Sequence, residues 1–240
     1  MYSNQKIQIF LLHFAGGSCY SFDFLKNYIQ NSFEYHALEL PGRGKRNLER
    51  HLHKKTDAID DYVSQIKRLR NSNQPYIIYG HSMGATLGLS VAKKMEEQLD
   101  SPHILIVSGN PGPGASYNDK VRHSLADSEF KEELRSLGGV PEEILEDEDL
   151  YNYFSPIMRA DFEILEKNKL SEVGLVINTP IYAVMGDQEE TSKDIQNWEL
   201  YTSGKFDYQV LPGNHFFIHN QVKTLAKIIS ECAAYSAVCT

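Results

Sequence analysis

Short apolar runs alternate with amphipathic stretches along most of this chain. Six such runs, each bounded by Gly, Pro, Asn or Ser, predict strands at residues 7–12, 35–40, 76–79, 103–107, 181–184 and 206–210. Several of these runs are apolar on both faces, so neither face can lie in water. A mainly parallel sheet has this property because crossover helices cover both of its sides. The pattern therefore predicts an α/β fold with a mainly parallel central sheet flanked by helices.

Amphipathic helices are predicted between the strands. After Thr56, apolar residues recur at helical spacing, with acidic residues near the start and basic residues near the end, as the helix dipole favours. The apolar face of this helix consists of Ile59, Tyr62, Val63, Ile66 and Leu69. The stretch from Asn220 repeats the pattern, and we expect it to close the fold.

The alternation of strands and helices is interrupted from Gly112 to about Leu170, where acidic helical segments occur instead. Because domains of roughly 200–250 residues are common for α/β folds, we expect one domain over residues 1–240, with a helical insertion at approximately 112–170. Added elements at the carboxyl ends of strands surround the ligand crevice in such folds. The insertion is therefore expected to form a lid.

Charge and composition exclude several classes of protein. The 24 Lys and Arg residues against 32 Asp and Glu give a net charge of −8, which argues against a nucleic acid as the main partner. No apolar run is long enough to span a bilayer, and no signal peptide is recognised, so we expect a cytoplasmic protein. Three cysteines are too few and too irregularly spaced for a disulfide framework or a metal cage.

The strongest chemical signal is Gly80-His81-Ser82-Met83-Gly84, a G-x-S-x-G motif between a predicted strand and a predicted helix. The glycines suit a sharp turn that leaves no room for Cβ atoms beside the serine. Ser82 is therefore the candidate nucleophile. The N–H of Met83, at the start of the following helix, is a candidate donor to a developing oxyanion.

A serine nucleophile needs a histidine base and an acid that orients the histidine. In folds with this turn, the acid and then the histidine follow the serine along the chain. His215 lies in a Gly-containing loop after the last predicted strand and is the candidate base, with His219 as its nearest competitor. After the penultimate strand, Glu189 and Asp187 are the candidate acids. We favour Glu189, three residues beyond the strand-ending glycine, and keep Asp187 as the alternative.

A second oxyanion donor is expected after the first strand. There, His13-Phe14-Ala15-Gly16-Gly17 contains a glycine pair that allows the backbone to turn its N–H groups towards the serine. Ala15 or Phe14 is the candidate donor. Alone, the segment would be read as an ordinary tight turn, and the G-x-S-x-G motif is what favours the catalytic interpretation.

Several segments, in order along nearly the whole chain, resemble the type II thioesterases that accompany non-ribosomal peptide and polyketide synthases. These enzymes have the α/β-hydrolase fold. The similar segments are the A-G-G segment at 15–17, the P-G-R motif at 41–43, the motif around Ser82, the lid segments L-G-G-V-P at 137–141 and P-I-M-R-A-D-F at 156–162, and G-N-H-F-F at 213–217. Two positions depart from the family pattern: Phe14 replaces a histidine, and Glu189 replaces an aspartate.

The resemblance implies hydrolysis of an acyl group from the 4′-phosphopantetheine arm of an acyl- or peptidyl-carrier domain, clearing stalled or misprimed chains. It implies no metal and no cofactor of the enzyme's own, and we expect a monomer that binds neither nucleic acid nor membrane. A local basic stretch can steer an acidic carrier domain, although a solvated charged loop explains it equally well. That stretch consists of Arg43, Lys45, Arg46, Arg50, Lys54 and Lys55.

Other functions remain open at this point. A carboxylesterase or an acyl-CoA thioesterase would use the same catalytic residues. A non-catalytic binding protein on the same fold would be expected to lack part of the constellation, whereas all its members are present here. The insertion's aromatic residues, Tyr151, Tyr153 and Phe154, line an acyl pocket or pack in a core.

Overall fold

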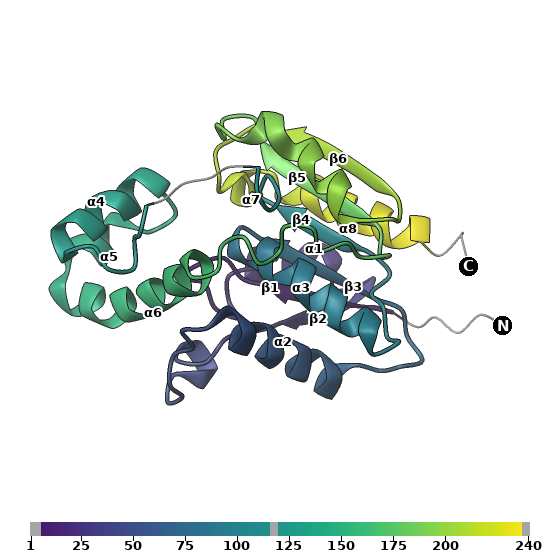
Figure 1. Cartoon of the computed structure of the whole chain (residues 1–240), viewed down its shortest axis with the longest axis horizontal. Helices are drawn as coiled ribbons and strands as arrows, with labels where there is room; N and C mark the ends of the chain where they lie inside the picture. The colour runs from purple at the N-terminus through teal and green to yellow at the C-terminus, as the bar shows by residue number, and fades with distance from the viewer. Residues whose placement is uncertain (1–5, 116–119, 237–240) are drawn as a thin grey trace.

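A computed structural model, which describes residues 6–115 and 120–236, contains a six-stranded sheet in the order β2-β1-β3-β4-β5-β6 (Figure 1). Every neighbouring pair is parallel. The strands are β1 (Ile7–Leu12), β2 (Phe33–Ala37), β3 (Tyr76–His81), β4 (Leu105–Ser108), β5 (Ile181–Gly186) and β6 (Phe206–Leu211). The predicted α/β class with a parallel central sheet is confirmed.

Helices cover both faces of this sheet. In Figure 1, α2 and α3 lie on one face, and α1 and α8 lie on the other. Their bounds are α1 (Asp23–Ile29), α2 (Lys55–Leu69), α3 (Met83–Glu97) and α8 (Val222–Ser236). Shorter elements are the 3-10 helices η1 (Gly44–Arg46) and η2 (Ser192–Tyr201) and the helix α7 (Phe217–Asn220).

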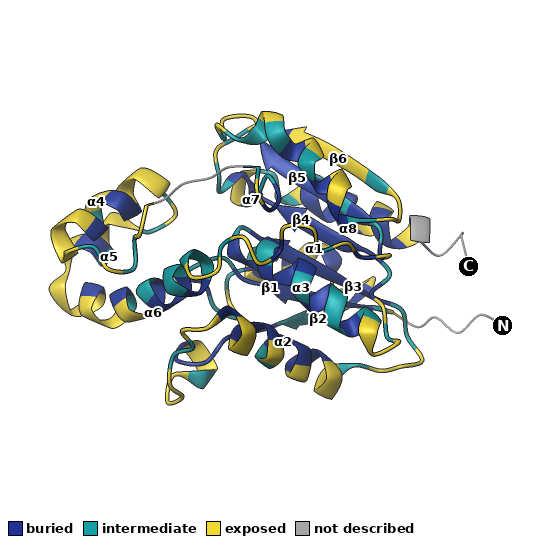
Figure 2. Ribbon diagram, viewed as in Figure 1, coloured by how far each residue is buried: buried dark blue, intermediate teal, exposed yellow. Residues whose placement is uncertain are grey.

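The inner strand β1 shows why both faces must be apolar. Phe10 and Leu12 pack in the core under α2 and α3, whereas Ile9 and Leu11 pack in the core under α1 and α8. All four side chains are fully buried, because successive side chains of a strand point to opposite faces (Figure 2). The two cores hold the sheet in the middle of three layers.

The insertion between β4 and β5 carries α4 (Asp127–Leu137), α5 (Glu142–Glu146) and α6 (Glu148–Glu166). It has a small apolar core of its own, which includes Phe130, Leu134 and Tyr151, with Phe154 packed against it. Tyr151 and Phe154 are therefore accounted for by packing, and Tyr153 is exposed. In Figure 1, α4 and α5 project to one side of the sheet, and α6 leads back towards it.

The second strand is shorter at its carboxyl end than predicted. Residues 38–40 are buried, and the Leu38 N–H still donates to the Leu11 carbonyl of β1, but beyond Leu38 the N–H groups bond to side chains, one of them on α2. Gln65 on that helix accepts from the N–H of Glu39 at 3.4 Å and donates to its carbonyl at 2.9 Å. The fourth strand likewise begins at Leu105 and not at residue 103.

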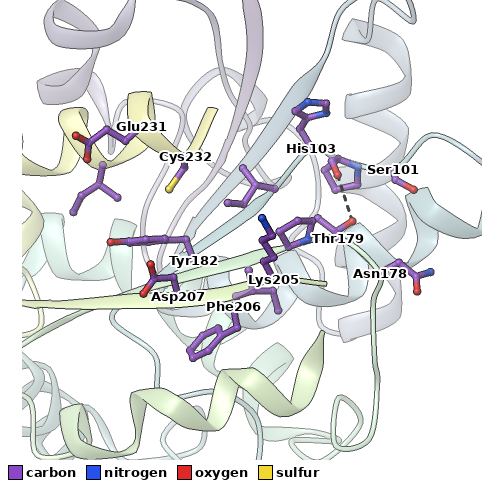
Figure 3. A pocket seen from close by; sticks show the side chains of 15 residues that line it. Ser101, His103, Asn178, Thr179, Tyr182, Lys205, Phe206, Asp207, Glu231 and Cys232 are labelled. Carbon is purple, nitrogen blue, oxygen red and sulfur yellow. Dashed lines mark hydrogen bonds between the residues drawn. The ribbon is translucent and has the colours of Figure 1, made fainter. Parts of the chain in front are cut away.

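A cavity of about 800 Å³ lies at the amino ends of β5 and β6, beside α8 (Figure 3). Its lining includes Pro102, Thr179, Tyr182, Phe206 and Cys232. Ligands of open α/β sheets bind at the carboxyl ends of the strands, so this cavity is at the opposite end from Ser82. Cys232 is buried and Cys19 half-buried, neither is in a disulfide, and Cys239 lies outside the described residues.

We find no helix, in the residues that the structure describes, with the length and apolar character needed to cross a membrane.

We expect Leu11→Ala, which empties a fully buried position in β1, to lower the free energy of unfolding by roughly 2–5 kcal/mol. The matched control is Leu48→Ala, at a side chain that is 97% exposed, for which a change within about 0.5 kcal/mol is expected. Urea unfolding followed by circular dichroism measures both, and equal losses would contradict the assignment of the core.

Candidate active site

Ser82 sits at the sharp turn between β3 and α3. Its φ of 54° and ψ of −111° are rare for a residue with a side chain, and such conformations persist only where the surroundings enforce them. Here the Ser82 N–H donates to the carbonyl of Ser108 at 2.8 Å, and the Ser82 carbonyl accepts from Ala85 N–H at 3.0 Å. The turn therefore holds the serine at the carboxyl end of the sheet.

The two glycines of the motif are required by close backbone contacts. A Cβ on Gly80 would overlap the carbonyl of Gly84, and a Cβ on Gly84 would overlap the carbonyl of Leu12. The second contact is informative, because it shows that the end of β1 lies directly against the first turn of α3. The segment after β1 is thereby brought beside Ser82.

His215 lies after β6 and is hydrogen-bonded to Glu189. The Nδ1 atom of His215 is 2.7 Å from Glu189 Oε2, and Glu189 Oε1 accepts from the N–H of Gly186 at 2.8 Å. Asp187 makes a different contact, since its Oδ1 accepts from the N–H of Gly213 at 2.9 Å. The structure thus brings Glu189 to the histidine ring, while Asp187 holds the loop that carries it.

Aromatic rings surround His215. The His81 ring, one residue before Ser82, has its centroid 5.0 Å from that of His215, and the Phe216 ring is 5.1 Å away. His219, the competing candidate base, stacks on the Phe216 ring and contacts the Phe24 ring. Within the described residues no hydrogen bond joins Ser82 Oγ to His215, a contact that is often long in substrate-free enzymes and closes on substrate binding.

His81 belongs to a buried polar chain that the sequence did not reveal. Its Nδ1 is 2.8 Å from Ser108 Oγ, which is also 2.7 Å from the hydroxyl of Tyr79. Burial, and then the charge of His215, holds the pKa of His81 well below its usual value. A neutral His81 therefore supports the His215 ring without adding a competing positive charge.

Hydrogen bonds to the carbonyl of Phe14 fix the orientation of the peptide group that joins Phe14 to Ala15. This carbonyl accepts from Gly17 N–H at 2.9 Å and from His13 Nδ1 at 2.8 Å. Because the peptide is planar and trans, the N–H of Ala15 points the opposite way from this carbonyl. In the described part of the chain, that N–H has no hydrogen-bond partner. The N–H of Ala15 therefore stays, with that of Met83, a candidate donor to an oxyanion.

His13 is fully buried and neutral. Burial, followed by the charge of Arg43, lowers the pKa of His13 to about 4. The neutral ring donates from Nδ1 to the Phe14 carbonyl and accepts at Nε2 from the N–H of Leu40, at 3.4 Å. This histidine was not among the residues predicted to act at the site.

The basic stretch after β2 is not a free cationic patch. Arg43 is buried against Asp161, and Lys55 is buried against Glu172. Arg46 is paired with Glu49 and Asp61. Three of the six cations therefore have structural partners inside the protein, which weakens the idea that this stretch steers an acidic partner.

Across residues 6–115 and 120–236, no cluster of three or more His, Cys, Asp or Glu side chains is placed to hold a metal ion.

The parallel sheet, with its strand–turn–helix around Ser82 after β3 and its histidine loop after β6, defines an α/β hydrolase. The model of the thioesterase domain family matches residues 7–233, so the chain belongs to that family and is a thioester hydrolase.

Individual relatives agree with this family. The gramicidin S biosynthesis protein GrsT of Aneurinibacillus migulanus is 30% identical, covering 90% of this chain and 85% of GrsT. The medium-chain S-acyl fatty acid synthase thioesterase of Rattus norvegicus is 30% identical, covering 93% of this chain and 87% of the rat protein. The solved structure of BorB, a type II thioesterase from the borrelidin biosynthetic cluster, is similar with a TM-score of 0.85 and 28% identity, covering 95% and 93% of the two chains.

The burial of neutral His13 predicts a pH dependence of stability. Its pKa of about 4 in the folded chain lies below the roughly 6.5 expected when unfolded, so the unfolded chain binds more protons between these values. Stability is therefore lost as the pH falls from about 6.5 to about 4. We expect His13→Gln to reduce the difference in unfolding free energy between pH 7 and pH 4.5 by about 2 kcal/mol. Urea titrations of both proteins at the two pH values test this, and identical differences would refute it.

Proposed function

We propose that Ser82, His215 and Glu189 form a catalytic triad, with the N–H groups of Met83 and Ala15 as the oxyanion hole. The observation that carries this proposal is the 2.7 Å contact between Glu189 Oε2 and His215 Nδ1. A carboxylate in this position holds the imidazole in one tautomer and stabilises the imidazolium. Glu189 is itself held by Gly186 N–H, which supports it over Asp187 as the acid.

In the proposed reaction, Ser82 Oγ attacks the acyl carbonyl carbon while His215 Nε2 takes the hydroxyl proton. The carbonyl oxygen becomes an oxyanion that accepts hydrogen bonds from the two N–H groups. When the carbon–sulfur bond breaks, His215 returns the proton to the leaving thiolate, and an acyl-serine remains. A water molecule, deprotonated by His215, then attacks this ester, and its collapse releases the free acid and restores the Ser82 hydroxyl.

The proposed substrate is an acyl, aminoacyl or peptidyl thioester on the phosphopantetheine arm of a carrier domain. The relationships to GrsT, a gramicidin S biosynthesis protein, and to BorB, a type II thioesterase, support a role in unloading stalled or misprimed chains of a peptide or polyketide synthase. The relationship to the rat enzyme favours release of medium-chain acyl groups from a fatty acid synthase as the second candidate. A cytoplasmic monomer without a cofactor fits either role.

We also propose that the insertion acts as a lid over the site. Gly139, between α4 and α5, lies against the Phe216 ring, the neighbour of His215. Met158 on α6 lies against Gly16, in the segment that follows β1. The insertion thus touches both sides of the proposed site, and its movement would open a path for an acyl chain.

The substrate proposal predicts a preference for carrier-bound thioesters. We expect kcat/KM for one acyl group on a carrier protein to exceed that for the same group on free pantetheine by about tenfold or more, because docking adds binding energy. The Ser82→Ala variant should reduce both rates to background. Equal rates on the two substrates would favour a general acyl-CoA thioesterase, and Ser82-independent turnover would refute the mechanism.

The two acids are separated by matched amide substitutions. We expect Glu189→Gln to lower kcat by roughly 10³–10⁴-fold, since His215 loses the charge that stabilises its imidazolium. Asp187→Asn keeps an oxygen that accepts from Gly213 N–H and should change kcat by less than about tenfold. Steady-state rates on an acyl-pantetheine measure both, and a larger loss for Asp187→Asn would reverse the assignment.

A further inference from the structure

Two sequence motifs that the proposed mechanism does not use meet in the fold. Arg43 ends the P-G-R motif after β2, and Asp161 lies in the R-A-D-F motif on α6 of the insertion. Arg43 Nη1 is 2.6 Å from Asp161 Oδ2, and Nη2 is 2.7 Å from Oδ1. The side chains are only 3% and 0% exposed, so this is a buried ion pair with two parallel hydrogen bonds.

The pair is bonded directly to the segment that follows β1. Asp161 Oδ2 also accepts from the N–H of Gly16 at 2.8 Å, and Arg43 Nη1 also donates to the carbonyl of Gly17 at 3.2 Å. Gly16 has a φ of 77°, which residues with a side chain rarely adopt. The insertion and the β2 loop thus hold this turn from one side by its backbone.

These contacts determine which amide is left for an oxyanion. Gly16 N–H is occupied by Asp161, and Gly17 N–H is occupied by the Phe14 carbonyl. The remaining amide of the turn, Ala15 N–H, is the one that the planar peptide directs away from that carbonyl. Without Asp161, Gly16 N–H would lose its partner, and the turn would lose one of the bonds that fix its conformation.

Charge explains why both members of the pair are needed. A lone carboxylate beside the oxyanion hole would repel the negative charge that develops on the substrate, and the Arg43 guanidinium cancels it. Buried ion pairs are often replaceable by apolar side chains without loss of stability. An apolar pair, however, has no oxygen for Gly16 N–H and no donor for the Gly17 carbonyl.

We propose that Asp161 and Arg43 are positioning residues that fix the Ala15–Gly17 turn, so that the oxyanion hole is formed only while α6 of the insertion is seated against it. This inference rests on the proposed function, because it takes Ala15 N–H as an oxyanion donor. It makes the insertion a structural part of the catalytic site.

Two double variants separate the hydrogen bond from the charges. Arg43→Met with Asp161→Leu removes both charges and the acceptor for Gly16 N–H, whereas Arg43→Met with Asp161→Asn removes the charges but keeps an acceptor oxygen. We expect the Leu variant to lose about 10- to 100-fold in kcat, with KM changed less than about threefold, because misplacing one oxyanion donor acts on the transition state. The Asn variant should recover a large part of that loss.

A transition-state probe distinguishes positioning from general damage. A trifluoromethyl ketone analogue of an acyl-pantetheine forms an oxyanion on Ser82, whereas the corresponding amide binds as the ground state. We expect the Leu variant to weaken inhibition by the ketone in step with kcat and to leave amide binding unchanged. If the Leu variant does not fold, Arg43→Lys, which keeps the charge but not the two parallel bonds, serves in its place. We expect it to weaken inhibition by the ketone several-fold and to leave amide binding unchanged.

The matched control is the second buried ion pair, Lys55 with Glu172, whose contacts are with Ser90, Asn168 and Ser171 and not with the turn. Lys55→Met with Glu172→Leu should leave kcat and ketone inhibition unchanged, whatever its effect on the melting temperature. The inference is overturned if the Arg43 and Asp161 variants keep full kcat and ketone inhibition, or if the control loses them equally. Failure of the proposed function is separate, since the wild-type protein would then show no Ser82-dependent turnover.

Discussion

The backbone at Ser82 is the constraint on which the rest of the site depends. Its φ of 54° and ψ of −111° cost on the order of 1–3 kcal/mol, so neighbouring parts of the fold must hold it in place. The Ser108 carbonyl from β4 holds it from one side, and the end of β1 presses on Gly84 from another. This close contact between β1 and α3 is also what places the turn after β1 beside the serine. One strained residue therefore determines which other loops reach the site.

The polar support of the site is buried and hydrogen-bonded. Glu39 accepts from the N–H groups of Cys19 and Lys45, as Asp161 accepts from that of Gly16. The segment from Gly16 to Cys19 is thus held by carboxylates from two distant parts of the chain. His13 and His81 add hydrogen bonds in neutral form, because burial lowers the pKa of each. Loops of irregular backbone gain a single conformation when buried groups satisfy their donors and acceptors.

The insertion combines two roles in one element. Its outer helices, α4 and α5, are largely exposed and pack around a small core of their own, whereas the end of α6 that carries Asp161 is buried in the main body (Figure 2). The inner part is constrained by the bonds of Asp161 to Arg43 and Gly16. As we propose, the insertion serves as the lid, and its inner part holds the Ala15–Gly17 turn through Asp161.

Local patterns along the chain determined the α/β class, the six strands and the residues that the proposed chemistry uses, because periodicity and a strand–turn–helix motif are expressed over a few residues. The predicted oxyanion segment and the preference for Glu189 likewise came from positions relative to strand ends. Only the tertiary structure decided that Glu189 and not Asp187 meets His215, that Glu39 bonds to Gln65 of α2 and not to a strand, and that Arg43 is a buried partner of Asp161 and not a surface cation. These are contacts between residues 26 to 118 positions apart, set by how helices and loops pack and by which buried groups need partners, and no local pattern contains that information.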